Sequence, residues 1–182
     1  MAIGRAAVLA LVAAALTSPA AGHAGAGRAV AVAPVGKKLT GAEIAAIRQE
    51  CETLAARYSL YLDGKDWQNL PSVFAEDGVW DILSNHLAGR DAIRDYWKSR
   101  TADWAPTHGR LHQVTNQVID VIDRDHARGT SMVIVYFFDT APGANKALTP
   151  LLIARNHDEF VRTAEGWKIK HRRVERIADV AH

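Results

Sequence analysis

The sequence predicts one α+β domain in which N-terminal helices cover one face of a bent antiparallel sheet. Two observations carry this prediction: a helical repeat that starts near residue 40, and four long β-rich stretches that follow residue 110. The composition, 48% hydrophobic and 23% charged in a chain of 182 residues, is that of a globular protein and excludes a disordered or collagen-like chain. The curve of the sheet is expected to leave a cavity beneath the helices.

Residues 1–24 have the pattern of a signal peptide. A positive charge at Arg5 precedes an apolar run over residues 6–16, which is about 11 residues long, whereas a membrane-spanning helix needs roughly 20. Small residues around Pro19 then supply a site for signal peptidase. Residues 25–39 show no usable period and are interpreted as a flexible linker. We therefore expect a periplasmic or secreted protein; an alanine-rich tail or an uncleaved anchor is the alternative.

The first helix of the domain is expected to begin at a capping box. Thr40 and Glu43 have the required spacing. Apolar side chains then recur every three or four residues, at Ile44, Ile47, Cys51, Leu54, Tyr58 and Tyr61. Gly64 is expected to end the helix. Cys51, the single cysteine, lies within the stripe and is interpreted as a buried small apolar residue.

The remaining elements follow from local patterns. Asp66 is expected to cap a short second helix whose inner side is Trp67, Leu70, Val73 and Phe74. Residues 79–83 predict a strand, and Gly89 opens a helix with Ile93, Tyr96 and Trp97 turned inward. Four β-rich stretches bounded by turns predict antiparallel hairpins: Leu111–Ile122, Gly129–Asp139, Leu151–Thr163 and Trp167–Ile177.

Charge and motif content exclude several classes of partner. Lys and Arg total 22 against 20 Asp and Glu, a net charge of +2, which is too balanced for a dedicated nucleic-acid binder. The sequence has no glycine-rich phosphate loop and no helical His-x-x-x-His pair, and its one cysteine cannot build a cysteine-rich zinc site. We expect no cofactor, no metal, and no membrane association once the signal peptide is removed.

Several short stretches match one family. They are Arg57–Trp67, Phe74–Trp80, Gly89–Ile93, His112–Asn116, Asn156–Arg162 and Gly166–Ile169. Together and in this order, over about residues 40–178, they resemble the SnoaL-like domains of the nuclear transport factor 2-like superfamily. The resemblance implies a cone, in which a curved antiparallel sheet wraps around the N-terminal helices and leaves a pocket at the open end. It also implies a homodimer through the outer face of the sheet.

Asp63 and His112 are the candidate catalytic residues. Asp63 ends a helix, where the dipole disfavours a carboxylate by roughly 0.3–1 kcal/mol, so either a pocket role or a plain turn explains it. His112 shares a strand face with Val114 and Asn116, which suggests a cavity wall; a partly exposed strand end is the alternative. The resemblance implies catalysis for both, because they match the catalytic aspartate and histidine of scytalone dehydratase and of a dehydrochlorinase. Such a pair forms a general base.

Five further residues are candidate substrate-binding groups: Tyr58, Trp80, Asn116, Tyr136 and Asn156. The resemblance matches Tyr58 to the oxyanion tyrosine of ketosteroid isomerase and Asn156 to a pocket asparagine of scytalone dehydratase. Trp80 and Tyr136 are candidates for the pocket wall, although such residues are more often part of an ordinary core. Apolar residues stand at Ile82 and Leu62, where those two enzymes carry functional side chains, so neither of their reactions is expected here.

The sequence therefore favours a cofactor-independent lyase or isomerase, of the dehydratase, cyclase or dehydrohalogenase kind, acting on a small hydrophobic or aromatic molecule. The alternatives are a non-catalytic periplasmic binding domain and an oligomer-forming module of the same fold, because fold does not determine function. A lyase needs Asp63 and His112 in contact at a cavity. A binding domain needs only the cavity, and an assembly module has a filled cone.

The signal peptide is testable by mass spectrometry. The exported protein is expected to begin between about residues 21 and 25, since the small residues of the cleavage region end there. An intact chain starting at Met1, recovered from the membrane fraction, would contradict this expectation.

Overall fold

The computed structural model describes residues 38–144 and 148–179, all within the compact unit Lys37–His182. The predicted signal peptide and all but the last two residues of the predicted linker lie outside the described residues. Within the described ranges, no helix is both long enough and apolar enough to cross a membrane.

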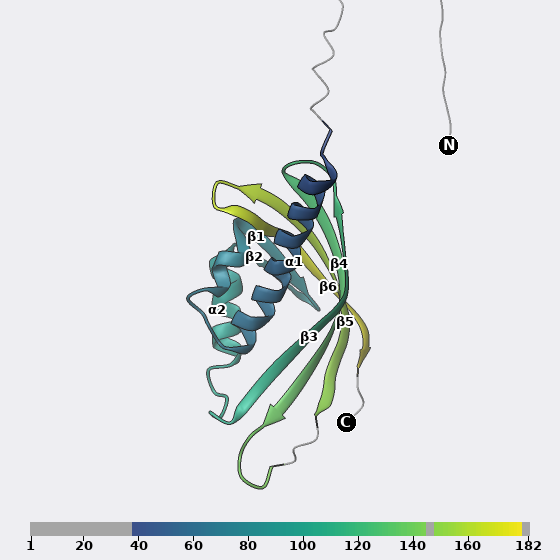
Figure 1. Ribbon diagram of the computed structural model, residues 1–182. Coiled ribbons are helices and arrows are strands. Elements are labelled where there is room, and N and C mark those ends of the chain that lie inside the picture. Colours follow the sequence, from purple (N-terminus) through teal and green to yellow (C-terminus); the bar gives the residue numbers. More distant parts are fainter. Residues whose placement is uncertain (1–37, 145–147, 180–182) are drawn as a thin grey trace, which may run out of the picture. The chain divides into compact units, whose positions relative to one another are not determined.

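The elements alternate as an α+β domain, which confirms the predicted class. In chain order they are α1 (Gly41–Asp63), the 3-10 helix η1 (Leu70–Val73), β1 (Phe74–Ile82), β2 (Asn85–Ala88), α2 (Arg90–Arg100), β3 (His108–Val121), β4 (His126–Asp139), β5 (Thr149–Thr163) and β6 (Gly166–Asp179). One six-stranded sheet has the order β2-β1-β6-β5-β4-β3. Both α-helices lie on its concave face (Figure 1).

Helix α1 forms as its sequence predicts. The Thr40 hydroxyl accepts a hydrogen bond from the Glu43 amide at 3.2 Å, and the Glu43 carboxylate accepts from the Thr40 amide at 2.7 Å. Four members of the apolar stripe are buried, namely Ile47, Cys51, Leu54 and Tyr58, while Ile44 and Tyr61 are only half-buried. Burial raises the pKa of the Cys51 thiol to about 12, so it stays a neutral core residue.

The end of α1 is a tight turn. Gly64 is the C-cap, as expected, but it keeps right-handed helical angles; Lys65, with φ of 54°, is the residue in the left-handed region. A side chain at Gly64 would place its Cβ 3.0 Å from the Leu60 carbonyl oxygen. Asp66 then binds the amide and the side chain of Asn69, at 3.1 and 2.7 Å.

The expected second helix is wrong in extent. Only Leu70–Val73 is helical, as one 3-10 turn, and Phe74 already begins β1. The four long strands β3 to β6 are antiparallel to one another, as predicted, but β1 pairs with β6 in parallel. No hairpin turn joins β1 to β6, so local sequence signals could not reveal this pairing.

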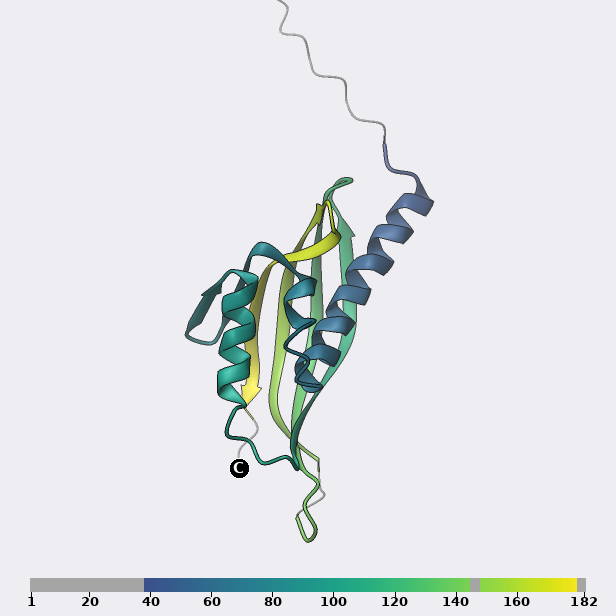
Figure 2. The ribbon, with the colours of Figure 1, turned by 90° about the vertical axis from the view of Figure 1, so that its left-hand side faces the viewer.

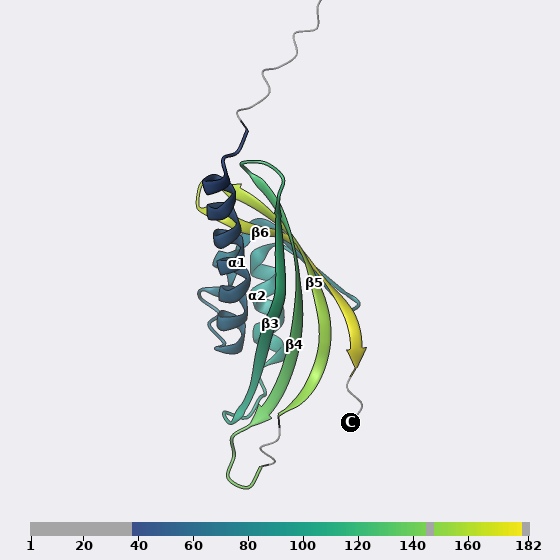
Figure 3. The same cartoon turned by 45° about the vertical axis from the view of Figure 1, so that its right-hand side comes forward.

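The helices share one face of the sheet. Figure 2 shows α1, η1 and α2 side by side in front of the strands, and Figure 3 shows the curve of β3, β4 and β5 behind them. Helix α1 packs mainly on β3, and α2 packs on β1. The main apolar core fills the space between these layers and includes Leu62, Phe74, Trp80, Ile93 and Phe160.

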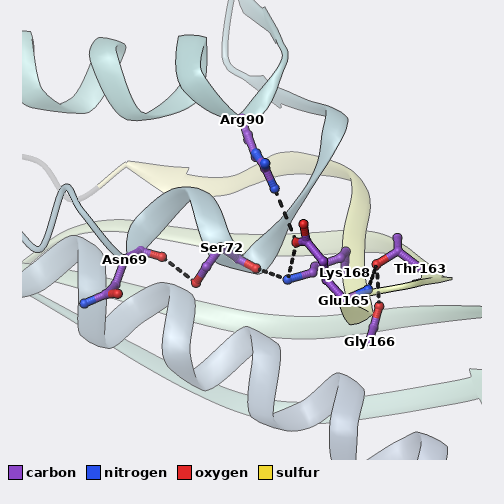
Figure 4. A network of polar contacts seen from close by, with 7 residues as sticks. All are labelled: Asn69, Ser72, Arg90, Thr163, Glu165, Gly166 and Lys168. Atoms are coloured by element: carbon purple, nitrogen blue, oxygen red, sulfur yellow. Dashed lines mark hydrogen bonds and ion pairs between the residues drawn. The ribbon is translucent and has the colours of Figure 1, made fainter.

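A polar network fastens the β5–β6 turn to η1 and α2 (Figure 4). Lys168 donates to the Ser72 carbonyl oxygen at 2.7 Å and pairs with Glu165 at 3.4 Å. Glu165 also lies 3.5 Å from Arg90 at the start of α2. The Lys168 side chain is largely buried, so its ammonium group is held by these partners in place of water.

One ion pair is fully buried in the core. Arg172 of β6 makes two hydrogen bonds to Asp158 of β5, at 2.7 and 2.8 Å, and both side chains are 2% exposed. The guanidinium also lies 4.4 Å from the centre of the Tyr58 ring. Burial alone would lower the pKa of Arg172, but the Asp158 carboxylate raises it above its ordinary value, so Arg172 stays charged.

Arg172→Met is expected to lower the free energy of unfolding by about 3–5 kcal/mol, because Asp158 is left charged and buried without a partner. Urea unfolding measures the change. Arg173→Met, at the exposed neighbouring position, is the matched control and should change little. Asp158→Leu combined with Arg172→Met should recover much of the loss, since a buried pair replaced by apolar groups often costs nothing. Equal stability of Arg172→Met and the control would contradict a structural role for the pair.

Candidate active site

A cavity of about 370 Å³ lies on the concave side of the sheet, under the helices. Its wall is mostly apolar and aromatic, with a few polar groups: Tyr58, Ser59, Trp80, Ile82, Leu83, Tyr96, Trp97, Arg100, Trp104, Arg110, His112, Val133, Val135, Phe137, Leu151, Leu152, Asn156 and Val174. This volume and this lining are typical of sites for small organic molecules.

Asp63 and His112 meet at the wall of this cavity. The Asp63 Oδ1 atom lies 2.5 Å from His112 Nδ1, and Asp63 Oδ2 accepts a hydrogen bond of 2.7 Å from the His112 backbone amide. One carboxylate therefore holds one residue at two points. The side chain of His112 is only 9% exposed and that of Asp63 only 16%, so little water competes for these bonds.

The placement of both residues follows from the fold. Asp63 is the last residue of α1, and His112 lies near the start of β3, the strand on which α1 packs. The two hydrogen bonds from His112 offset the repulsion between the carboxylate and the C-terminal end of the helix dipole. This arrangement explains why an acidic residue is accommodated at the end of α1.

The contact also determines the protonation pattern of the imidazole. A carboxylate at Nδ1 favours the neutral tautomer that carries its proton there, which leaves the lone pair on Nε2. Nε2 makes no hydrogen bond to any residue in the described ranges, and the ring lines the cavity. In its neutral form, His112 therefore directs the Nε2 lone pair to whatever occupies the cavity.

Tyr58 lies beside the histidine, deep in the cavity wall. Its ring makes edge contacts with Phe74, Trp80 and His112, with centroids 5.9, 5.9 and 6.5 Å away. Burial raises the pKa of the Tyr58 phenol well above its ordinary value. The hydroxyl consequently stays protonated and able to donate a hydrogen bond.

Trp80 and Asn156 also line the cavity, where the sequence placed them. Trp80 belongs to β1 and stacks at 5.0 Å against Trp97 of α2. Asn156 of β5 is 5% exposed, and its amide donates to the Ser131 hydroxyl at 3.3 Å. Ile82 lines the cavity as well, so an apolar group stands where the resemblance with ketosteroid isomerase would require a base.

Asn116 and Tyr136 do not line the cavity. Asn116 adopts a left-handed conformation, with φ of 51°, where the β3–β4 register shifts between Thr115 and Val118. This bulge breaks the two-residue alternation that had placed Asn116 beside His112, and its side chain is exposed. Tyr136 alternates with Val135 and Phe137, which do line the cavity, so its side chain is on the other face. There its hydroxyl donates a hydrogen bond of 3.5 Å to Gln113 Oε1.

Sequence reasoning missed three prominent parts of the wall. Arg110 stands two residues before His112 on β3 and therefore on the same face, a signal that the sequence contained. Arg100 ends α2, and Trp104 belongs to the loop after it, where no periodicity exists to predict direction. In the part of the chain that the structure describes, no three His, Cys, Asp or Glu side chains gather as metal ligands would.

The chain matches the sequence profile of the family described as "SnoaL-like domain" over residues 43–173. No curated protein matches. Solved structures with the same fold include a Novosphingobium aromaticivorans DSM 12444 protein provisionally assigned as a scytalone dehydratase, with a TM-score of 0.66 and 21% identity over 79% of this chain and 92% of that one.

Two further structures extend this likeness. ActVI-ORFA from Streptomyces coelicolor has a TM-score of 0.63 and 20% identity, over 72% of this chain and 97% of its own. A Novosphingobium aromaticivorans protein described as NTF2-like with a cystatin-like fold has a TM-score of 0.62 and 22% identity, over 77% and 88% of the two chains. At these identities the structures establish the fold alone, and the last of them describes that fold as cystatin-like.

The tautomer of His112 is directly measurable. Nitrogen-15 spectra at a pH of about 8.5, well above the ordinary histidine pKa of about 6.5, should find the proton on Nδ1 and a bare Nε2. Asp63→Ala removes the acceptor, so this preference should disappear while the other histidine signals stay in place. A proton on Nε2 in the wild-type protein would contradict the assignment.

Proposed function

Because the chain belongs to the SnoaL-like domain family, we propose that it is a cofactor-independent lyase or isomerase acting on a small hydrophobic or aromatic molecule. Its general base is His112, and Asp63 orients and stabilises that base. The observation that carries the proposal is the two-point contact between Asp63 and His112 at the wall of a largely apolar cavity.

The proposed step is a proton abstraction from carbon. Nε2 of His112 takes a proton from a carbon next to a carbonyl group, or from a carbon whose neighbour carries a leaving group. The electron pair moves onto the carbonyl oxygen, giving an enolate, or forms a double bond as the neighbouring group leaves. A halide leaves as the anion, whereas a hydroxyl group leaves as water after it takes the proton that His112 has abstracted. Asp63 stabilises the imidazolium that results, without itself being protonated.

Two neighbouring groups fit supporting roles. The Tyr58 hydroxyl is protonated and lies near the ring of His112, so it is suited to donate a hydrogen bond to a developing oxyanion. Trp80 and Trp97 offer flat apolar surfaces to a ring-shaped substrate, and Asn156 adds a polar contact at the far wall. None of these roles calls for a nucleophilic serine or cysteine.

The alternatives account for fewer of these observations. A non-catalytic binding domain explains the cavity but gives no reason for a half-buried carboxylate that binds both the ring and the backbone amide of one histidine. An oligomer-forming module calls for a filled cone, and an open volume of about 370 Å³ counts against it. The comparisons supply relatives of the same fold and leave the reaction to experiment.

A thermal-shift screen with aromatic and polyketide-like ketones identifies ligands, and nuclear magnetic resonance in D₂O then follows exchange of their acidic C–H protons. His112→Ala is expected to slow exchange by about 10²–10⁴-fold, because a positioned base typically contributes that much. Asp63→Asn should also slow it. The double variant should be little slower than the worse single variant, since the two residues act as a unit.

Tyr136→Phe is the matched control, because that ring lies on the outer face of the sheet, and it should leave the exchange rate unchanged. Wild-type exchange rates in His112→Ala would make the pair structural, and the binding-domain alternative would then replace the proposal.

A further inference from the structure

Arg110 is a charged group of the cavity wall that the proposed mechanism does not use. Its guanidinium lies over two tryptophan rings, 4.2 Å from the centre of Trp97 and 4.8 Å from that of Trp104. It makes no ion pair or hydrogen bond with any described residue, and its buried Nε atom has no acceptor. A charge in this position is normally matched by an opposite charge.

The contrast with Arg172 is informative. Arg172 is buried and Arg110 is half-buried, and both lie against aromatic rings, but Arg172 donates two hydrogen bonds to the Asp158 carboxylate. Arg110 contacts only the faces of aromatic rings. These faces attract its charge, but they do not accept hydrogen bonds from all of its N–H groups. Burial lowers the pKa of Arg110, although a guanidinium remains protonated throughout the physiological range.

The rest of the cavity wall also offers hydrogen-bond donors and lacks acidic side chains. Among the described residues that line it, none is acidic and two are arginines, Arg100 and Arg110. The indole N–H groups of Trp80 and Trp97 are buried there without an acceptor. The Asp63 carboxylate attracts Arg110 at a distance, but both of its oxygens bind His112 and neither forms an ion pair or hydrogen bond with Arg110. A ligand with an anionic acceptor group would supply what this wall lacks.

We propose that the substrate is an aromatic or polycyclic acid whose carboxylate is bound by Arg110. A carboxylate matches the planar fork of a guanidinium, which can bind it with two parallel hydrogen bonds. The attached ring system then lies against the tryptophans of the wall. This proposal rests on the proposed function, because it names the substrate class for the same site.

The side chains of Arg110 and His112 start about 7 Å apart on β3, because they are two positions apart and each residue of a strand adds roughly 3.3 Å. The carboxylate and the carbon that loses its proton are therefore different parts of the substrate. Arg110 acts as the anchor of the remote group, and its contribution is to binding and orientation. Loss of Arg110 should consequently raise KM or Kd more than it lowers the rate of the bound complex.

The test compares two ligands of nearly equal shape, 2-naphthoate and 2-naphthamide, by isothermal titration calorimetry on the full domain. The wild-type protein should bind the carboxylate at least about tenfold more tightly, as charge-assisted hydrogen bonds do relative to neutral ones. Arg110→Gln should remove this preference without weakening the binding of the amide. Arg110→Lys, which keeps the charge but loses the fork, should retain only part of it.

Two matched variants separate this inference from the proposed reaction. Arg100→Gln removes the exposed arginine of the same wall and should leave most of the preference in place. His112→Ala should keep the preference for 2-naphthoate over 2-naphthamide, while it slows the exchange of C–H protons in the ligands found by the screen. Equal affinity of the wild-type protein for the two ligands, or no binding of 2-naphthoate, overturns the acid proposal and leaves the general-base proposal standing.

Discussion

The positive charge of Arg172 has to be neutralised inside the core, and this requirement connects much of the domain. Its partner Asp158 lies on the neighbouring central strand, so the ion pair joins β5 to β6 in the middle of the sheet. The same guanidinium packs against the ring of Tyr58. Tyr58 belongs to α1, so the packing of that helix on the sheet depends on Arg172, whose charge is balanced by Asp158.

The cavity lies beside the apolar core that joins the helices to the sheet. Apolar side chains close the contact in the main core, with residues such as Leu62 and Phe74 fully buried. Towards the open end the contact is polar, and Asp63 reaches from the end of α1 to His112 on β3. The bond that positions the histidine is thus also a bond that holds the helix to the strand.

Local patterns predicted the elements well, because a capping box and an apolar stripe depend on neighbours along the chain. The family resemblance brought Asp63 and His112 together, which periodicity alone did not. The errors arise where the chain departs from regular geometry or pairs over a long distance. The bulge turns Asn116 away from the cavity. Strand β1 pairs in parallel with β6, although the two strands lie far apart in the sequence. Arg110 was overlooked because an isolated basic residue in a strand usually faces solvent.

The two-point attachment of His112 has a stereochemical consequence. A histidine held by its ring alone can tilt about its side-chain bonds, whereas here the same carboxylate also binds its backbone amide, so the direction of the Nε2 lone pair is fixed relative to the strand. In the proposed reaction, a flat substrate beside Trp97 would meet that lone pair on one of its two faces only. Of two prochiral hydrogens on a single carbon, the base would then remove one and leave the other, so the two hydrogen bonds to Asp63 would make the reaction stereospecific.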